Sequence, residues 1–459
     1  MKNVHLSTEN LDLTPQNISK KKAFWIIPFA LLLLVSIWGA FLPIDAKVFV
    51  ADEKIVPADM AWMLTATGLV LLMTPGLAFF YGGMVASKSL ISTMLQSFIA
   101  MGVISIIWVV FGFSLAFGES IGGLIGNPMT YFMFQNVGAK TDANLSPTIP
   151  LLLFAMFQLK FAIITPALIT GSFAERVRFS AYLLFMVLFC IFIYAPLAHW
   201  TWHPEGFLRK MGVLDFAGGT VVHLSAGCAA LAGAIFLRRR QSHLENQVHT
   251  PANIPFVLLG TGMLWFGWFG FNAGSALSAS PLAILAFATT NTASASAAIS
   301  WVFFDALQGR KPSAMGACIG AVVGLVAITP AAGFVSIGAS IFIGTFASII
   351  SNLVVHFKNK SNLDDTLDVF PCHGVGGMFG MLATAVFSSK AINPAGADGL
   401  LYGGTTLFFY HLLALLIVVI FSFAGSFALY FLVNSVLKIR VTLEQEQLGL
   451  DLSQHGERF

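Results

Sequence analysis

Two histidines, His223 and His373, lie inside strongly apolar stretches of the chain, DFAGGTVVHLSAG and DVFPCHGVGGMFG. An ionisable side chain within a membrane-length apolar segment is costly to charge, and it is therefore a candidate functional residue. Two neutral imidazoles can donate and accept hydrogen bonds, and they can pass a proton between them. Two other interpretations remain open. The histidines could be unrelated core residues bonded to backbone carbonyls, or axial ligands of a buried haem, which the neighbouring glycines disfavour because they indicate tight helix packing.

The composition indicates that these histidines belong to a membrane protein. Of the 459 residues, 57% are hydrophobic and only 10% are charged, whereas a soluble domain carries about 25% charged residues. A water-facing surface is therefore excluded for most of the chain, and a soluble enzyme with it. No basic stretch is interleaved with aromatic residues, so we expect a lipid bilayer and no nucleic acid as partner.

The cysteines give no sign of a metal or redox site. They are Cys190, Cys228, Cys318 and Cys372, all within or at the start of apolar segments and without a CxxC pair. Isolated cysteines in such segments are typical of small packing residues. A P-loop for ATP is also missing from the sequence. We expect no metal, no cofactor and no enzymatic activity.

The elements that must position the histidines are transmembrane helices, because a span needs about 20 mostly apolar residues. From Asp59 onward eleven apolar segments occur, at roughly 60–84, 92–117, 150–174, 179–197, 218–237, 254–274, 280–304, 314–331, 334–356, 371–388 and 401–437. Strand-type alternation is absent, and the 42 glycines are typical of closely packed membrane helices. The sequence predicts an all-α polytopic membrane protein.

The N-terminal region, residues 1–58, has the layout of a leader followed by a linker. Its polar start ends in Lys20, Lys21 and Lys22, and an apolar run follows from Ala23 to about Ile44. This order resembles a secretory signal. The run is long for one, however, and a cut after Ala40 would put the bulky Trp38 at the minus-three position. Both a cleaved leader and a retained extra helix at 23–44 remain open.

The basic residues predict the orientation of the core. One set of segment ends carries thirteen of them: Lys88, Arg176, Arg178, Arg238, Arg239, Arg240, Arg310, Lys311, Lys358, Lys360, Lys438, Arg440 and Arg458. The opposite set carries six: Lys47, Lys54, Lys140, Arg209, Lys210 and Lys390. Because cytoplasmic loops are enriched in Lys and Arg, we expect the core to begin outside and the C-terminus to be cytoplasmic.

An internal echo relates the two halves of the core. Asp215 precedes His223 by eight residues, and Asp365 precedes His373 by eight residues. In the expected topology the first segment enters the membrane from outside and the second from inside. Opposite entry with matched polar residues is typical of inverted repeats, whose interface usually holds the solute path. We expect two inverted five-helix repeats followed by a final helix.

Longer motifs identify a family. The chain resembles the ammonium transporter (Amt/Rh) family, on its bacterial Amt branch, over the whole core from about residue 59 to the end. The matching stretches are TPGLAFFYGGMV (74–85), FQLKFAIITPALITGSFAERVRFSA (157–181), DFAGGTVVH (215–223), WFGWFGFNAGSA (265–276), ACIGAVVGLVAITPAAG (317–333), DVFPCHGVGG (368–377) and EQEQLGLDLSQHGE (444–457).

The resemblance implies a homotrimer with a pore through each subunit, and it implies roles for single residues. Phe157, Trp202 and Ser275 match an outer ammonium recruitment site, which Asp215 supports by capping and by its field. Phe161 and Phe271 match a stacked phenyl gate, and His223 and His373 match the pore-lining pair. Glu119 matches an outer acidic residue.

These roles agree with the chemistry of the residue types. Aromatic faces attract an ammonium ion by about 0.5–2 kcal/mol each, and a serine hydroxyl can accept one of its N–H bonds. We expect Asp215 to cap the amides of Ala217 or Gly218 as well. We expect the two imidazoles to lie in contact, with nitrogen atoms about 2.7–3.2 Å apart.

Lys160, within FQLKFA, departs from the family pattern. It lies about 15 Å into its helix and about 60° around the helix from Phe157. A protonated amine facing the path would repel ammonium. We expect the side chain to turn toward a helix or subunit contact and to meet a carbonyl, hydroxyl or carboxylate there.

The implied mechanism is that of a channel-like transporter in the bacterial plasma membrane. It would recruit ammonium outside, deprotonate it at or beyond the phenyl gate and conduct ammonia past the imidazoles, serving nitrogen assimilation. The alternative is an ammonium sensor that signals through a cytoplasmic partner and conducts little. The resemblance divides the chain into the core, 59–437, and a C-terminal regulatory tail, 438–459, that packs on the cytoplasmic face and is controlled by a PII-type protein. A simply solvated tail is the other interpretation.

Overall fold

The structure is a computed structural model that describes residues 15–43 and 46–459. Contacts within the chain divide it into two units, Met1–Phe49 and Val50–Phe459. The first unit contains the helix α1 (Pro15–Ala40), with Pro28 inside it, and the 3-10 turn η1 (Ala46–Phe49). The polar tail predicted before α1 falls largely on residues 1–14, outside the described part.

The predicted apolar run at 23–44 therefore lies mostly in one continuous helix. Its 26 residues span about 39 Å at 1.5 Å per residue, which exceeds the roughly 30 Å of a bilayer core. Cleavage of this helix remains a prediction, as do the boundaries at residues 58 and 438.

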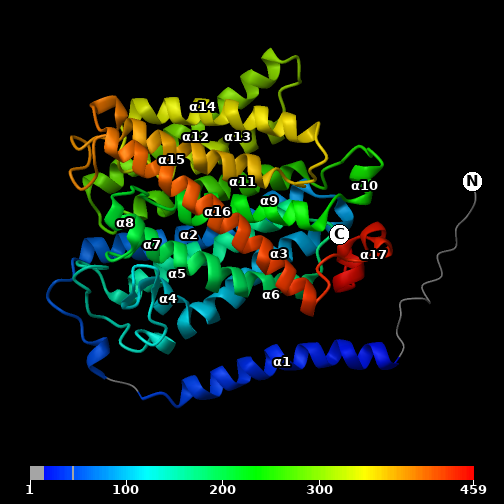
Figure 1. Cartoon of the computed structure of the whole chain (residues 1–459), viewed down its shortest axis with the longest axis horizontal. Helices are drawn as coiled ribbons and strands as arrows, with labels where there is room; N and C mark the ends of the chain where they lie inside the picture. The colour runs from blue at the N-terminus through cyan, green and yellow to red at the C-terminus, as the bar shows by residue number, and fades with distance from the viewer. Residues whose placement is uncertain (1–14, 44–45) are drawn as a thin grey trace, which may run out of the picture. The chain divides into compact units, whose positions relative to one another are not determined.

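The second unit consists of helices (Figure 1). The first half contains α2 (Pro57–Met84), η2 (Ser87–Ser89), α3 (Leu90–Ile107), η3 (Trp108–Gly112), α4 (Phe113–Phe117), η4 (Phe132–Phe134), α5 (Leu151–Ile169), η5 (Thr170–Ser172), α6 (Phe179–Phe189), η6 (Cys190–Tyr194), α7 (Ala195–Trp202), α8 (Phe207–Met211), η7 (Gly219–Leu224), α9 (Ser225–Leu237) and α10 (Gln241–Leu244). A short antiparallel hairpin of β1 (Ser120–Ile121) and β2 (Ile125–Gly126) pairs Ser120 with Gly126.

The second half continues with α11 (Ile254–Trp268), η8 (Phe269–Ala273), α12 (Pro281–Leu307), α13 (Ala314–Ile328), α14 (Ile337–Asn359), η9 (Phe370–Val375), α15 (Gly376–Phe387), η10 (Leu400–Tyr402), α16 (Thr405–Val436), α17 (Leu443–Leu448) and η11 (Asp451–His455). Three of these helices begin at a serine, Ser280, Ser313 or Ser336, whose side chain accepts an amide of the first turn.

The eleven core spans predicted from the sequence are confirmed. Among the described residues, ten helical segments are long and apolar enough to cross a membrane, and the shorter apolar α13 supplies the eleventh core span. Each lies within a few residues of its predicted segment, apart from the fourth, which runs on to Met211. The all-α polytopic fold follows.

The spans approach one another closely at glycines. A Cβ atom on Gly260 of α11 would lie 2.3 Å from the backbone nitrogen of Phe80 in α2, so no larger residue fits there. A Cβ on Gly227 of α9 would lie 2.2 Å from the backbone nitrogen of Gly374 in η9. Such contacts let helix backbones pack in lipid without a hydrophobic driving force between them.

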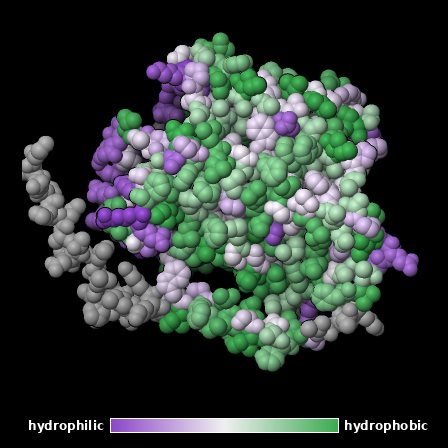
Figure 2. Space-filling view, turned by 180° about the vertical axis from the view of Figure 1, so that it is seen from behind, coloured by the Kyte–Doolittle hydropathy of each residue, from purple (hydrophilic) through white to green (hydrophobic). Residues whose placement is uncertain are grey.

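The distribution of polarity agrees with membrane embedding. Figure 2 shows mostly hydrophobic side chains between two edges at which hydrophilic side chains gather. One of these edges carries the C-terminal segment with α17 and η11, beside α10 (Figure 1). The charged residues therefore concentrate at the ends of the helices, where a bilayer would leave them in water.

Candidate functional site

The two histidines lie in contact inside the core. His223 in η7 and His373 in η9 are 1% and 3% exposed, with ring centroids 5.5 Å apart. Their Nδ1 atoms are 3.3 Å apart, slightly beyond the range of 2.7–3.2 Å that we predicted. Contact between the rings is thus confirmed, but the hydrogen bond is a long one. The Nε2 atom of His223 is buried and has no hydrogen-bond partner among the described residues.

Local backbone geometry brings these rings together. Both histidines sit in π-helical turns, which interrupt regular helices and occur frequently at functional sites. Gly227 lies four residues after His223, and Gly374 lies one residue after His373. These two glycines are in close contact. Larger side chains at these glycines would separate the helices and therefore the imidazoles.

Each π turn begins at an aspartate cap. The Asp215 carboxylate accepts the amides of Gly218, Gly219 and Thr220 at 2.7–2.8 Å and the Thr220 hydroxyl as well. The predicted cap on the amide of Ala217 or Gly218 is therefore confirmed at Gly218. The turn requires Gly218, whose φ of +118° is left-handed.

The second aspartate repeats this arrangement. The Asp365 carboxylate accepts the amides of Val369 and Phe370, four and five residues further on, as Asp215 does with Gly219 and Thr220. The matched spacing in the sequence therefore corresponds to a matched structure, as expected of the two repeats.

The predicted gate residues stack on each other, and one of them, Phe271, stacks on His223. The ring centroids of Phe161 in α5 and Phe271 in η8 are 4.2 Å apart, and both side chains are buried. Phe271 in turn lies 5.9 Å from the ring of His223. Two phenyl rings at this separation leave no open passage between them, so the path is occluded at this point.

The predicted recruitment residues contact the two gate residues. Phe161 contacts Phe157 at 4.9 Å and Trp202 at 5.8 Å between ring centroids. The indole of Trp202 donates to the carbonyl oxygen of Asp215 over 3.2 Å. The Ser275 hydroxyl donates to the carbonyl of Phe271, which leaves its oxygen able to accept another hydrogen.

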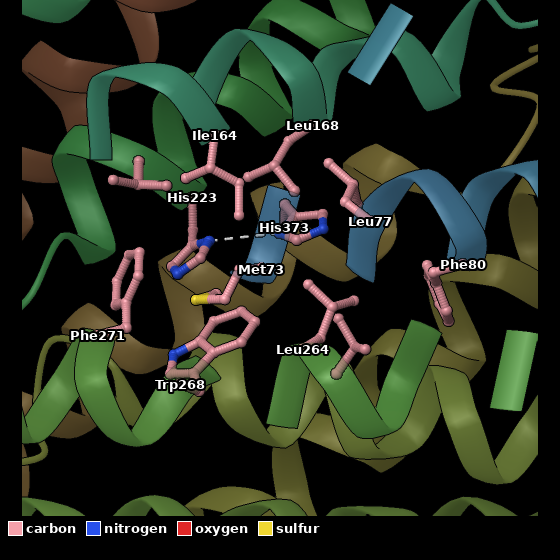
Figure 3. Close-up of a pocket in the computed structure, with 12 residues that line it drawn as sticks. Met73, Leu77, Phe80, Ile164, Leu168, His223, Leu264, Trp268, Phe271 and His373 are labelled. Atoms are coloured by element: carbon pink, nitrogen blue, oxygen red, sulfur yellow. Dashed lines mark hydrogen bonds between the residues drawn. The ribbon is translucent and has the colours of Figure 1, made fainter. Parts of the chain in front are cut away.

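A small cavity continues from the gate along the histidines (Figure 3). Its volume of about 10 Å³ is enough for one water-sized molecule. Apart from His223 and His373, its lining is apolar: Met73, Leu77, Phe80, Ile164, Leu168, Val222, Leu264, Trp268, Phe271 and Val322. Such walls cannot replace the hydration shell of an alkali cation.

Two further residues discussed from the sequence, Glu119 and Lys160, do not line the inner cavity. Glu119 is exposed and borders a separate surface hollow of about 460 Å³ with Ser120, Glu205, Phe207 and Lys210. None of these five residues lines the inner cavity. The role of Glu119 as an outer acidic residue stays a prediction.

Lys160 is 7% exposed on α5, the most buried of the candidate spans that the structure describes. It does not line the inner cavity, as expected. Its amine makes no hydrogen bond or ion pair with any described residue. The expected partner on a neighbouring helix is therefore not found within the described chain, and a partner at a subunit contact stays a prediction.

The sequence analysis missed three aromatic or titratable residues of the core. Trp268 stacks on His223 with centroids 5.3 Å apart and donates its indole hydrogen to Thr329. His199 and His411 are both completely buried. The rule that selected His223 and His373, an ionisable residue inside an apolar span, applies equally to these two histidines.

The end of the core next to the C-terminal segment carries a network of ion pairs. Arg240 bonds Glu175 at 2.7 Å and Asp364 at 2.9 Å. Burial alone would raise the pKa of Asp364, but Arg176 and Arg240 outweigh it and hold the pKa below its usual range. For the neighbouring Asp365, burial prevails over Lys358 and raises the pKa to about 6.

The C-terminal segment is attached to this end. Arg440 donates to the carbonyls of Leu237 and Arg239 and pairs with Glu446 at 2.9 Å. Asp451 accepts the first amides of α3, those of Ile91 and Ser92. A solvated tail is therefore excluded for this segment, since its side chains cap and pair with the core.

Metal chemistry finds no support in this arrangement. In the described ranges no group of three or more His, Cys, Asp or Glu side chains is placed to hold a metal ion. The four cysteines are free and buried.

Eleven spans around a water-sized cavity define a polytopic helical membrane protein that handles a small solute. The comparison with known proteins is more specific. A family model described as "Ammonium Transporter Family" matches residues 61–458, and the chain belongs to this family. The identification made from the sequence motifs is confirmed.

Individual relatives agree in sequence and in structure. The chain is 45% identical to the ammonium transporter of Bacillus subtilis over 401 residues, which cover 87% of this chain and 98% of the relative. The crystal structure of Candida albicans Mep2 matches with a TM-score of 0.82 at 32% identity, over 90% of this chain and 92% of Mep2. A structure titled "Sensor Amt Protein" matches with a TM-score of 0.78 at 29% identity, over 87% and 98%.

Proposed function

We propose that the chain recruits ammonium outside, removes one proton from it at or beyond the phenyl gate and conducts ammonia past the imidazoles. The observation that carries this proposal is the unbroken line from Trp202 through Phe161 and Phe271 to His223 and His373. An ammonium ion is attracted by the aromatic faces and by the acceptor oxygen of Ser275. The water-sized, apolar cavity beyond the rings admits ammonia but no hydrated cation.

The proton balance assigns a role to the imidazoles. Ammonium gives up one proton to become ammonia, and the unpartnered Nε2 atom of His223 can accept that proton while the ring passes its Nδ1 hydrogen on to Nδ1 of His373. The shared bond between His223 and His373 supports transfer between the rings. This pair is thus the proposed polar lining for a solute that has left its hydration shell.

Uptake of labelled methylammonium tests the proposal, in cells that lack transporters of their own. The full chain should confer saturable uptake that ammonium competes for and that potassium does not. Membrane expression without uptake would contradict transport. It would favour the alternative, an ammonium sensor with little conduction, which the match to the solved sensor supports.

The assembly and its orientation complete the proposal. We infer a homotrimer in the bacterial inner membrane with the C-terminus in the cytoplasm, supported by the excess of basic residues at that end. The attached C-terminal segment offers a surface for a PII-type signalling protein, which would couple conduction to nitrogen assimilation. Native mass spectrometry of the purified chain tests the trimer, and co-purification with a PII-type protein tests the partner.

A further inference from the structure

His411 bridges the two parts of the molecule that carry the proposed recruitment site and the pore. It lies on α16, which packs beside α15 (Figure 1), and it is completely buried. Its Nδ1 atom is 2.8 Å from the carbonyl oxygen of Met381 in α15. Its Nε2 atom accepts the backbone amide of Leu214 over 3.0 Å.

These two partners define the form of the imidazole. The Met381 carbonyl can only accept a hydrogen, so Nδ1 carries one, and the Leu214 amide can only donate, so Nε2 carries a lone pair. Neutral His411 therefore satisfies both groups. A second ring proton would point at the Leu214 amide, and an apolar side chain would leave that amide buried without an acceptor.

The bridged groups belong to the site. Leu214 directly precedes Asp215, whose carboxylate caps η7 and whose carbonyl accepts the indole of Trp202. Met381 lies on the helix that continues from the turn of His373. On the other side of Asp215, the Phe216 amide bonds to the carbonyl of Pro330. The Asp215 segment is thus held from both sides, by His411 and by Pro330.

We propose that His411 is a positioning residue, which fixes the Asp215–Trp202 segment against α15 and thereby sets the affinity of the outer site. This inference rests on the recruitment role proposed above. The two roles can be tested separately. Uptake that survives Asp215→Ala overturns the recruitment role of Asp215. Loss of uptake in Asp215→Ala, together with an unchanged KM in the His411 variants, overturns only the positioning role of His411.

Substitutions at position 411 test the proposal, because they differ in whether the new side chain can bond both the Met381 carbonyl and the Leu214 amide. In His411→Gln the amide can donate to Met381 and accept from Leu214, so the KM for methylammonium should stay within about twofold of wild type. In His411→Leu and the shorter His411→Asn, the Leu214 amide loses its acceptor, and KM should rise about tenfold with little change in maximal rate.

Ser422→Ala is the matched control. Ser422 is completely buried on the same helix, and its hydroxyl has no partner among the described residues. This variant should keep the wild-type KM. If His411→Leu fails to reach the membrane, the comparison of His411→Asn with His411→Gln decides. An unchanged KM in His411→Asn, a fall in maximal rate at constant KM, or failure of His411→Gln to restore KM would each overturn the positioning role.

Discussion

The outer and inner ends of the core use the same cap but compensate its charge differently. Asp215 and Asp365 each bond the amides four and five residues ahead and begin the turn that carries a histidine. Asp215 has no ion-pair partner among the described residues. Asp365 lies beside Asp364, which pairs with Arg240, and close to Lys358, which pairs with Asp368 at 2.7 Å.

This difference indicates how a symmetric scaffold acquires a direction. Under the proposed orientation, a carboxylate without a counter-ion would leave its field at the outer mouth, where it would attract an incoming cation. At the other end, basic side chains compensate the acidic ones, so that end would attract ammonium less. The repeats therefore supply the geometry of the path, and the residues around each cap supply its polarity.

Of the substitutions considered, removal of the Asp215 cap should reduce methylammonium uptake the most. In Asp215→Ala the amides of Gly218, Gly219 and Thr220 lose their acceptor and the outer field disappears, so methylammonium uptake should fall at least about a hundredfold. Asp215→Asn keeps the volume and one acceptor oxygen and should lose less. Wild-type uptake by Asp215→Ala at normal membrane expression would remove Asp215 from the mechanism.

A smaller effect is expected from the aromatic face that adjoins this field. Trp202→Leu removes the indole, and a cation–π contribution of about 0.5–2 kcal/mol corresponds to an increase in KM of about 2- to 30-fold. Phe80→Leu is the matched control, because Phe80 lies beyond His373 from the gate (Figure 3). An equal rise in KM for both variants would show that packing, rather than outer recruitment, determines the affinity.

The Asp365 cap should give the free energy of unfolding a characteristic pH dependence. The pKa of Asp365 is raised to about 6 in the fold from 3.8, so the folded state holds its proton more tightly than the unfolded state. The contribution of this carboxyl to stability should therefore be greatest below about pH 4 and fall by about 3 kcal/mol as the pH rises to about 6.

Asp365→Asn should remove that part of the pH dependence. Thermal unfolding in detergent between pH 4.5 and 7.5 measures it, as the difference between wild type and variant at each pH. The loss of uptake should be smaller than in Asp215→Ala, because no cation has to be attracted at this end. A difference between the two proteins that does not vary with pH would contradict a titrating Asp365.

Much of this organisation was predictable because membrane embedding imposes strong rules on sequence. Span length and hydropathy located all eleven core helices, and the spacing of Asp215 and Asp365 from their histidines indicated a structural repeat, though not that Asp365 caps its turn as Asp215 does. The motifs identified the aromatic residues that prove to stack on the histidine pair.

Other features leave no local signal in the sequence. The bond from Leu214 to His411 joins residues 197 positions apart, so nothing near either residue announces it. The close contact of Gly227 with Gly374, beside the two π turns, likewise joins residues far apart in the chain. The surroundings of Lys160 depend on how α5 is buried, which a position on a helical wheel does not determine.

The smallest effect on transport is expected from Lys160→Met. Lys160 lies about 60° around α5 from Phe157, outside the lining of the inner cavity, and its amine bonds to no described residue. A mostly buried amine is costly to keep charged, so methionine of similar length should leave the selectivity for ammonium over potassium unchanged and should not lower the melting temperature. Lys358→Met is the contrasting control, because it breaks the pair with Asp368 and the bond to the Asp365 carbonyl and should lower the melting temperature. Stopped-flow measurements on proteoliposomes would report ammonium and potassium permeation side by side. If Lys160→Met admits potassium or changes the charge moved per ammonium, the lysine belongs to the conduction path, and the polarity of the core is then set at its centre as well as at its two caps.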